Sequence, residues 1–385
     1  MDRRDSRLVV PHVLALALVS VAAAALFYLP FWLHAPSVGG VPFNHQGMER
    51  VSGMWDGPLY VTAAATLWDL NPRNPAYAWY GAKPAAYAER FPLYPLLIRG
   101  LSPLLSYWEG ALAINVAAST GVTLALYALL RLLGTAATSA FWVSLAAIFW
   151  PPRGFLYRYV AMSDPLFILG LVAATYCFLR RRYVLAGLFG AVAVASRPNG
   201  FQVVAGFGLL ALWRIAAAPT GARLRQTLDL AGLALIPLTL LGIYGWHWWH
   251  FGDPLASVHA ATFVQPEAKL FPSLAFFGIG EEGIPYLFVL ALAGIVELAR
   301  RRRWELVVLS IVFYVPALLV PTDASRYLLP VIPFVFFVAG DRLVASVPLR
   351  VALVLSLPLI YVYAWETMLA PGYQAPFGPL YSLLR

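Results

Sequence analysis

The sequence predicts an all-α protein, a polytopic transmembrane bundle of about ten or eleven helices with a long first outer loop. Hydrophobic residues make up 61% of the 385 residues, and charged residues only 12%. Soluble domains average about 45–50% apolar and about 25% charged residues, so one water-soluble core cannot hide this apolar surface. The arginines lie in short clusters between apolar runs. The formal charge of +9 therefore indicates membrane topology, and we expect no nucleic-acid partner.

The first span is expected at 9–33, where an apolar run follows a charged N-terminal segment. This run is longer than the roughly 7–15 apolar residues of a secretory signal, so we expect an uncleaved helix. A helix needs about 20 mostly apolar residues to cross a bilayer. The other candidate spans are 108–133, 137–152, 164–179, 183–196, 199–217, 228–250, 284–299, 304–320, 327–340 and 349–366.

The basic residues predict the orientation of these helices, because Lys and Arg collect in short cytoplasmic loops. With the N-terminus in the cytoplasm, the runs Arg180–Arg182 and Arg300–Arg303 both fall on the cytoplasmic side, and most acids fall on the other side. Almost every basic residue is arginine, which is typical of a GC-rich bacterial genome. We therefore expect a multi-pass protein of a bacterial cytoplasmic membrane with its active face outside.

The polypeptide is expected to form one membrane domain over 1–385, without internal repeats. Its first extracytoplasmic loop, 34–107, is rich in Trp and Tyr and is too long for a simple connection. Within it, Trp55–Leu70 and Phe91–Leu105 are predicted to be amphipathic helices that lie in the membrane interface. The second large extracytoplasmic loop is expected at 251–283.

The polar residues that are candidates for a functional site lie at the outer ends of the predicted spans. The spans themselves carry almost no charge, which argues against an ion- or proton-coupled transporter. Five separated stretches are expected to converge on one membrane face, which predicts a site there. They are Trp55-Asp56, Ser163–Pro165, Ser196–Gly200, Asp253 with His259, and Ser325–Tyr327.

Each of these residues also has a structural interpretation. A loop aspartate such as Asp56 is usually a helix cap or a solvated charge. Asp164, which precedes a proline, is typical of a helix start. Arg197 and Arg326 are typical of arginines that snorkel to the interface, and His259 is typical of a surface histidine. The interpretation as a site and the structural interpretation both stay open at this point.

The sequence predicts no metal site and no cofactor. The single cysteine, Cys177, lies within an apolar run and cannot form an intrachain disulfide. His247 and His250 are first of all part of an aromatic interface belt, although their i, i+3 spacing is compatible with metal binding. No Asp-x-Asp pair occurs, so a carboxylate pair for a divalent cation is unsupported.

Carboxylates and arginines at a membrane surface suit a lipid-phosphate substrate. A carboxylate can take a proton from a hydroxyl group, and arginine can hold a phosphate with two hydrogen bonds and stabilise it as a leaving group. Glycosyl transfer from a lipid-linked sugar phosphate fits these groups, because its transition state resembles an oxocarbenium ion.

The ordered motifs resemble the GT-C superfamily of polyprenyl-phosphate-sugar-dependent glycosyltransferases. Within it they are most similar to the GPI mannosyltransferase II (PIG-V) family and its bacterial relatives. The resemblance covers about 55–334, and the set of motifs is more specific than any single one. The motifs are Trp55-Asp56, ERFPLYPLLIR at Glu89–Arg99, MSDPLF at Met162–Phe167, SRPNG at Ser196–Gly200, GDPLASVHA at Gly252–Ala260 and SRYLLPVIPF at Ser325–Phe334.

The resemblance implies an inverting transferase that moves a sugar, most often mannose, from a polyprenyl-phosphate donor to a hydroxyl of a glycan, lipid or protein. Asp56 would be the base for that hydroxyl, and Asp164 would be a second catalytic acid where relatives carry Ser-Glu. Membrane lipids would surround the chain. Arg197, His259 and Arg326 would face the donor phosphate or the sugar, and Trp55, Asn199 and Tyr327 would be further substrate-binding residues.

Three rival functions remain. A transporter or flippase for a lipid-linked sugar predicts internal repeats, midplane polar groups and broken helices. A non-catalytic membrane assembly subunit explains the acids as caps but not their location on one side. An oligosaccharyltransferase-like enzyme is disfavoured because metal carboxylates and a large soluble domain are missing.

Overall fold

The computed structural model describes residues 8–80, 84–264, 284–318, 324–370 and 378–384. Within these ranges the chain is helical apart from loops and one antiparallel pair of two-residue strands, β1 (Ser37–Val38) and β2 (Val41–Pro42). The predicted all-α class is confirmed. Residues 265–283, most of the second large outer loop expected at 251–283, lie outside the described residues.

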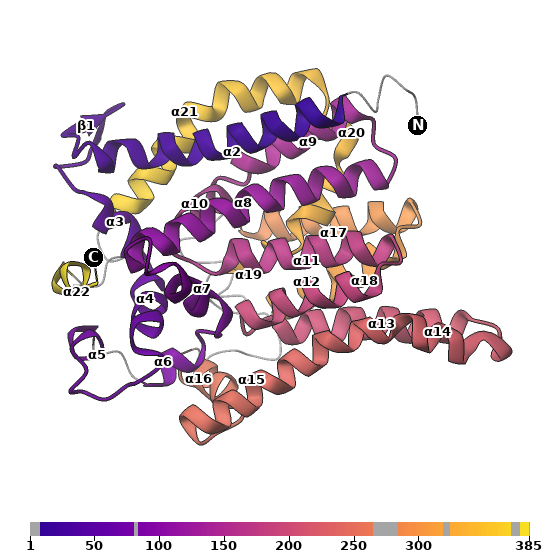
Figure 1. The fold of residues 1–385 in the computed structure, drawn as a ribbon. Helices are drawn as coiled ribbons and strands as arrows, with labels where there is room; N and C mark the ends of the chain where they lie inside the picture. Colours follow the sequence, from indigo (N-terminus) through magenta and orange to yellow (C-terminus); the bar gives the residue numbers. More distant parts are fainter. Residues whose placement is uncertain (1–7, 81–83, 265–283, 319–323, 371–377, 385) are drawn as a thin grey trace.

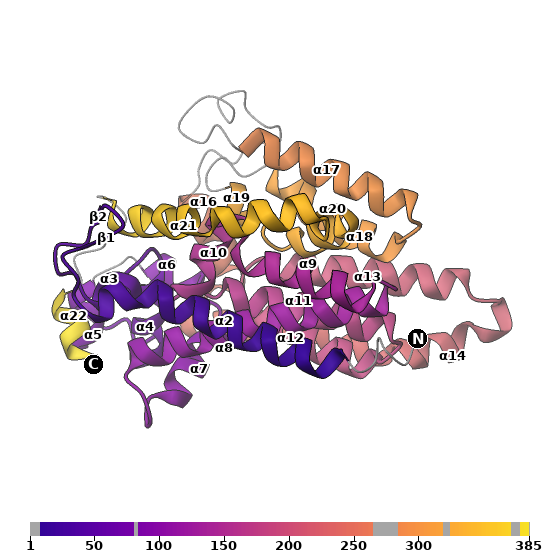
Figure 2. The ribbon, with the colours of Figure 1, turned by 90° about the horizontal axis from the view of Figure 1, so that it is seen from above.

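The longer helices run roughly along one common direction (Figures 1 and 2). Neighbouring helices pack in the order α2, α8, α11, α12 and α15, and α9 lies against both α2 and α8. The longer helices are α2 (Val9–Trp32), α8 (Tyr107–Leu132), α9 (Ala137–Phe149), α11 (Asp164–Leu179), α12 (Tyr183–Ser196), α13 (Gly200–Ala217), α15 (Leu235–Phe251), α17 (Ile284–Arg300), α18 (Trp304–Ala317) and α21 (Val347–Leu369).

Short helices connect the long ones, and several of them gather at one end of the bundle (Figure 1). They are α3 (Met48–Ser52), α4 (Gly57–Thr66), α5 (Pro75–Tyr80), α6 (Pro84–Ala88), α7 (Leu93–Leu101), α10 (Pro152–Tyr159), η1 (Thr220–Ala222), α14 (Arg223–Asp229), η2 (Leu230–Ala234), α16 (Ala256–Val264), α19 (Ala324–Leu328), the π-helical segment η4 (Pro333–Val338), α20 (Asp341–Val344) and α22 (Gly378–Leu383).

Five described helices are long and apolar enough to cross a membrane, and a sixth span results if α10 and α11, bent by 106°, are counted together. Large apolar side chains on these helices face outward: Leu18 is 71% exposed and Leu355 is 72% exposed. Such a surface is costly in water and favourable in lipid. The chain therefore has the character of a polytopic α-helical membrane protein.

The predicted number of spans exceeds these five or six because several predicted spans form shorter helices. The helices α9, α12 and α18 have 13 or 14 residues and are about 20 Å long at about 1.5 Å per residue. The hydrocarbon core is about 30 Å thick. Length alone therefore does not qualify these helices as complete spans.

The stretch predicted as one span at 327–340 is broken. It holds the end of α19, a turn, and the π-helical segment η4. Pro330 and Pro333 lack the N–H group that a continuous α-helix requires, and Pro333 begins η4. The break places Arg326, in α19, beside other polar residues at the end of the bundle.

The first outer loop differs from the predicted interfacial arrangement. In α4, which lies within Trp55–Leu70, every residue except Ala65 is buried, so this helix is enclosed by protein. By contrast, α7 has the expected two faces, because Tyr94 and Ile98 are buried whereas Leu96 is 48% exposed. Only the second of the two predicted amphipathic helices is therefore consistent with an interfacial position.

The contact between α11 and α12 depends on glycine. A Cβ atom on Gly170 would lie 2.7 Å from the backbone nitrogen of Ala193, closer than real Cβ contacts allow, so only glycine permits this approach. Small residues serve this purpose between membrane helices. The close pairing brings the start of α11 next to the end of α12, where the candidate site lies.

Candidate functional site

Six charged residues from five segments meet toward the end of the bundle that holds α4, α6 and α7 (Figure 1). They come from the residue before α4, the two residues after α6, the start of α11, the residue after α12, and α19. We call them the ion-pair network: Asp56, Glu89, Arg90, Asp164, Arg197 and Arg326.

Arg326 is the centre of this network. Its Nη2 atom lies 3.2 Å from Asp56 Oδ2 and 3.1 Å from Asp164 Oδ2. Its Nε atom donates to Asp164 Oδ1 at 3.2 Å, so Arg326 holds Asp164 with two parallel hydrogen bonds. Arg197 pairs with the same Oδ1 atom of Asp164. One arginine therefore joins two carboxylates that are 108 residues apart in the sequence (164 − 56).

Arg90 extends the network on the other side of Asp56. Its Nη2 atom lies 2.7 Å from Asp56 Oδ1, and its Nη1 atom lies 3.2 Å from Glu89 Oε2. Three carboxylates thus face three guanidinium groups. The Asp164 side chain is only 3% exposed, whereas that of Asp56 is 20% exposed. Charges so far from water must be paired to be stable, and Asp56 remains the more accessible of the two aspartates.

Aromatic side chains cover the network. Tyr157 lies under Arg326, with the guanidinium carbon 5.4 Å from the ring centroid, and Trp55 packs against Tyr157 with centroids 4.8 Å apart. Trp55 has a φ of 44°, a left-handed conformation that costs about 1–3 kcal/mol in a bulky residue. The turn that contains Trp55 therefore holds Asp56 toward the arginines at an energetic cost.

Contacts of Tyr60 connect Arg90 with the start of α11. The guanidinium carbon of Arg90 lies 5.6 Å from the centroid of Tyr60. The Tyr60 hydroxyl and Ser163 Oγ are 2.7 Å apart and form a hydrogen bond. Because Ser163 directly precedes Asp164, this bond ties α4 to the start of α11 and fixes the two aspartates relative to each other.

The arginines determine the ionisation of Asp56. Burial raises the pKa of its carboxyl group, but the charges of Arg90 and Arg326 outweigh burial, and the net pKa lies below the usual value. For Glu89 burial is the larger effect, and its pKa is raised despite the charge of Arg90. Asp56 is therefore ionised at neutral pH, and Glu89 takes up a proton before Asp56 as the pH falls.

The other predicted binding residues occupy different positions. Tyr327 follows Arg326 and packs against the main hydrophobic core. The Asn199 amide donates to Gln202 Oε1 at 3.1 Å, within its own segment. His259, in α16, has its Nδ1 atom 2.6 Å from Oδ2 of Asp253, which lies just before this helix, and the His259 side chain is 58% exposed. The contacts of Asn199 and His259 described here are local and do not reach the ion-pair network.

Sequence reasoning missed two members of the network and its aromatic support. Glu89 and Arg90 begin the motif ERFPLYPLLIR but were not predicted as site residues, and neither was Tyr157. The available signal was an acid–base pair in an otherwise apolar and aromatic stretch, since such charges are expensive near a membrane unless they are paired. The partner of that pair, Asp56, was not visible from spacing.

A narrow crevice of about 40 Å³ lies between the helices, and Asp164 is one of the residues that line it. Tyr157, Arg158 and Asp164 are polar residues of its lining, and Arg158 donates to the Ala147 carbonyl at 2.8 Å. The remaining walls are mostly apolar. They comprise Val122, Leu126, Ala147, Trp150, Pro151, Gly154, Pro165, Ile168, Leu329, Ile332, Pro333 and Phe337, with Ser119.

Within the described residues, no group of three or more His, Cys, Asp or Glu side chains is arranged to hold a metal ion. His247 instead bonds through Nε2 to the Ala88 carbonyl at 3.1 Å and packs against Phe91, with ring centroids 5.5 Å apart. These contacts are those of a structural histidine within an aromatic cluster.

No protein-family model and no curated protein matches this chain. The resemblance of its motifs to a glycosyltransferase family therefore stays a prediction, and the functional argument depends on the site itself.

Proposed function

We propose that this chain is a multi-pass membrane glycosyltransferase of the GT-C type, an inverting mannosyltransferase that uses a polyprenyl-phosphate-linked donor. One observation carries the proposal: Arg326 binds both Asp56 and Asp164, and Asp164 lines a mostly apolar crevice. A carboxylate that can accept a proton and a guanidinium that can bind phosphate thus lie next to a mostly apolar crevice, which would admit a lipid chain if the helices around it spread.

In the proposed reaction, Asp56 takes the proton of the acceptor hydroxyl. The hydroxyl oxygen then forms a bond to the anomeric carbon, and the bond between that carbon and the phosphate oxygen breaks. The phosphate leaves with the electron pair, and Arg326 stabilises its negative charge. Asp56 suits the role of base because it is ionised and is the more exposed of the two aspartates.

Donor binding would also make Asp56 a better base. Without donor, Arg90 and Arg326 hold the pKa of Asp56 low, and a carboxylate with a low pKa accepts a proton poorly. A donor phosphate on Arg326 adds a negative charge near Asp56 and takes over part of this arginine. Both effects raise the pKa of Asp56 toward the working pH.

The remaining parts of the proposal concern the membrane. The prenyl tail would enter the crevice, whose small volume requires α8 to α11 and residues 329–337 to spread. The network would face the outside of a bacterial cytoplasmic membrane. The arginine runs 180–182 and 300–303 follow the ends of α11 and α17, away from the network, and such runs favour the cytoplasmic side. The shorter helices would complete ten or eleven passes by crossing a locally thinned bilayer. Thinning the bilayer to match a short helix has only a modest free-energy cost.

The experiment that tests this function measures mannosyl transfer from radiolabelled polyprenyl-phosphate mannose by the purified chain in lipid nanodiscs. Transfer to an acceptor hydroxyl is expected for the wild type and should be lost in Asp56→Asn. Asp69→Asn is the matched control, because Asp69 is an exposed aspartate of the same loop, bonded to Asn71 and Asn74. Full transfer by Asp56→Asn would remove Asp56 as the base.

A flippase for a lipid-linked sugar is the second candidate, and the 106° bend between α10 and α11 favours it, because broken helices are common in transporters. The same labelled donor separates the two functions. Movement of intact donor between leaflets, with no new glycosidic bond under any acceptor tested, would support the flippase and contradict the transferase. Neither activity would point to a non-catalytic assembly subunit.

A further inference from the structure

Arg158 places a positive charge on the wall of the mostly apolar crevice that Asp164 also lines. Its Nη1 atom donates to the Ser119 carbonyl at 3.2 Å, and its Nη2 atom donates to the Ala147 carbonyl at 2.8 Å. Both Ser119 and Ala147 line the same crevice. The guanidinium group of Arg158 therefore lies between residues of the crevice wall and is held against α8 and α9.

The charge of Arg158 has no counter-charge among the residues that the structure describes, because no carboxylate there lies within ion-pair distance of it. Its bonds to two neutral carbonyls use two of the five N–H groups of a guanidinium. The crevice, with a volume of about 40 Å³, leaves room for only a few water molecules. A cation that is neither paired nor well hydrated is costly inside a membrane protein, and such residues commonly mark functional sites.

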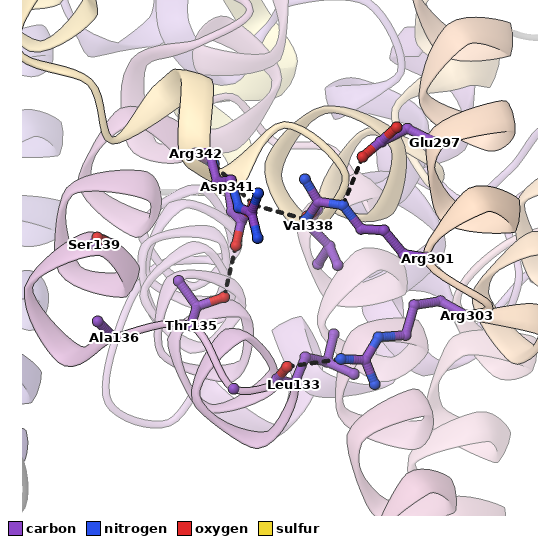
Figure 3. A pocket seen from close by; sticks show the side chains of 11 residues that line it. Leu133, Thr135, Ala136, Ser139, Glu297, Arg301, Arg303, Val338, Asp341 and Arg342 are labelled. Atoms are coloured by element: carbon purple, nitrogen blue, oxygen red, sulfur yellow. Dashed lines mark hydrogen bonds and ion pairs between the residues drawn. The ribbon is translucent and has the colours of Figure 1, made fainter. Parts of the chain in front are cut away.

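Two other arginines show how such a charge is ordinarily accommodated. Arg301 is paired with carboxylates, since its Nε atom lies 2.8 Å from Glu297 Oε1 and its Nη1 atom lies 2.8 Å from Asp341 Oδ1 (Figure 3). Arg303 lines a cavity of about 490 Å³ (Figure 3), which has room for many water molecules. Arg158 has neither arrangement, so an anion that enters the crevice would supply the partner that its charge lacks.

The charge balance of the neighbouring site indicates which anion fits. The ion-pair network has no net formal charge, because three carboxylates face three guanidinium groups. Arg158 adds one positive charge next to it, since it follows Tyr157, whose ring lies 5.4 Å from the guanidinium carbon of Arg326. A polyprenyl-phosphate sugar is a phosphodiester with one negative charge, which matches this single positive charge. A diphosphate-linked sugar carries two negative charges and would leave one of them uncompensated.

We propose that Arg158 binds the phosphate of the lipid-linked donor in the crevice, and that its single charge selects a monophosphate donor over a diphosphate donor. The N–H groups that the two carbonyls leave unused would donate to phosphate oxygens. The identity of this ligand rests on the proposed function, whereas the binding of an anion rests on the contacts of Arg158 alone. Arg158 is thus a binding residue, and Asp56 remains the proposed base.

The test measures binding of radiolabelled polyprenyl-phosphate mannose to the full chain in phosphatidylcholine nanodiscs, separately from mannosyl transfer. Arg158→Gln removes the charge but keeps N–H groups that can donate to a carbonyl. It should weaken donor binding by roughly tenfold or more, because hydrogen bonds to charged groups are the stronger ones. The matched control is Arg99→Gln, since Arg99 also donates to two carbonyls, those of Ala64 and Ala65, but does not line the crevice. This control should bind donor as the wild type does.

A second variant and two competing lipids sharpen the test. Arg158→Lys keeps the charge and should bind donor within about threefold of the wild type; it keeps the test decisive if Arg158→Gln does not fold. In the wild type, unlabelled polyprenyl-diphosphate mannose should compete at least about tenfold less well than unlabelled polyprenyl-phosphate mannose, because an uncompensated buried charge is costly. Phosphatidylglycerol, an ordinary membrane phosphodiester with one negative charge, should not displace the donor.

The outcomes separate this inference from the proposed function. Unchanged binding by folded Arg158→Gln, or a loss of binding in folded Arg158→Lys, would overturn the role of Arg158 while transfer by the wild type would still support the transferase. Equal competition by the diphosphate lipid would overturn the charge selection, and displacement by phosphatidylglycerol would make a bulk phospholipid the source of the phosphate. Donor binding that depends on Arg158 without any transfer would support the binding role and contradict the transferase. A wild type that binds no donor would contradict both.

Discussion

The ion pair between Asp56 and Arg90 allows the energy of the network to be measured directly. The perturbation is a double-mutant cycle with Asp56→Asn, Arg90→Gln and the combined variant. The Nη2 and Oδ1 atoms are 2.7 Å apart, and the two side chains are 11% and 20% exposed. Asp56→Asn keeps the size of the side chain and removes only the charge, whereas Arg90→Gln also shortens the side chain. The combined variant cancels this second effect, so the coupling energy reports the ion pair.

The magnitude follows from this geometry. Two unit charges about 4 Å apart interact by about 4 kcal/mol at an effective dielectric constant of about 20. Partial exposure screens the pair, and Arg326 holds the other oxygen of Asp56 in every variant that keeps the carboxylate. We therefore expect a coupling of about 2 kcal/mol, inside the range of about 0.5–3 kcal/mol for contacting residues.

The assay is reversible unfolding in mixed micelles with increasing denaturing detergent, for the four proteins at pH 7 and at low pH. Because the folded-state pKa of Asp56 is depressed, its contribution to stability is complete above the ordinary aspartate pKa of about 4. This contribution is lost as the pH falls through the lower folded-state pKa. The coupling should therefore be present at pH 7 and disappear in strong acid.

The control cycle uses Arg214 and Glu305, which are 2.9 Å apart with both side chains 23% exposed. This isolated and more exposed pair should couple by only about 0.2–1 kcal/mol. A coupling below about 0.5 kcal/mol for Asp56 and Arg90 at pH 7 would refute the reasoning, because Arg90 would then not be neutralising Asp56.

Three further predictions concern the ion-pair network and the contact between α11 and α12. Glu89→Gln should leave the free energy of unfolding at pH 7 unchanged or raised. Burial raises the pKa of Glu89, so the ionised carboxylate destabilises the folded state at pH 7, and this cost is removed only as the pH falls. Clear destabilisation of the variant at pH 7 would contradict this. Gly170→Ala should destabilise the chain by about 1–3 kcal/mol in the same unfolding assay, since the added Cβ would lie 2.7 Å from the Ala193 nitrogen. Arg326→Lys keeps the charge but loses the paired hydrogen bonds to Asp164, so the KM for donor should rise more than the KM for acceptor; equal changes in both would mean that Arg326 is only structural.

The sequence alone determined the class of the protein and the position of most long helices. The predicted spans 164–179 and 183–196 coincide with α11 and α12. These features are local, because an apolar run must hide from water and a charged or proline-containing stretch ends it. The aspartates and arginines at the outer helix ends were also visible, because charges stand out against an apolar composition.

Tertiary structure alone decided which charges meet. Asp56 and Arg326 are 270 residues apart, and Asp56 and Arg90 are 34 apart, so no local spacing relates them. Their contact depends on the break in 327–340, on the left-handed turn at Trp55, and on the burial of α4. Each of these depends on packing between segments, where the cost of strain or of a buried charge is offset by neighbours from elsewhere in the chain. The sequence shows which residues are charged, but only the folded structure determines which of them form ion pairs.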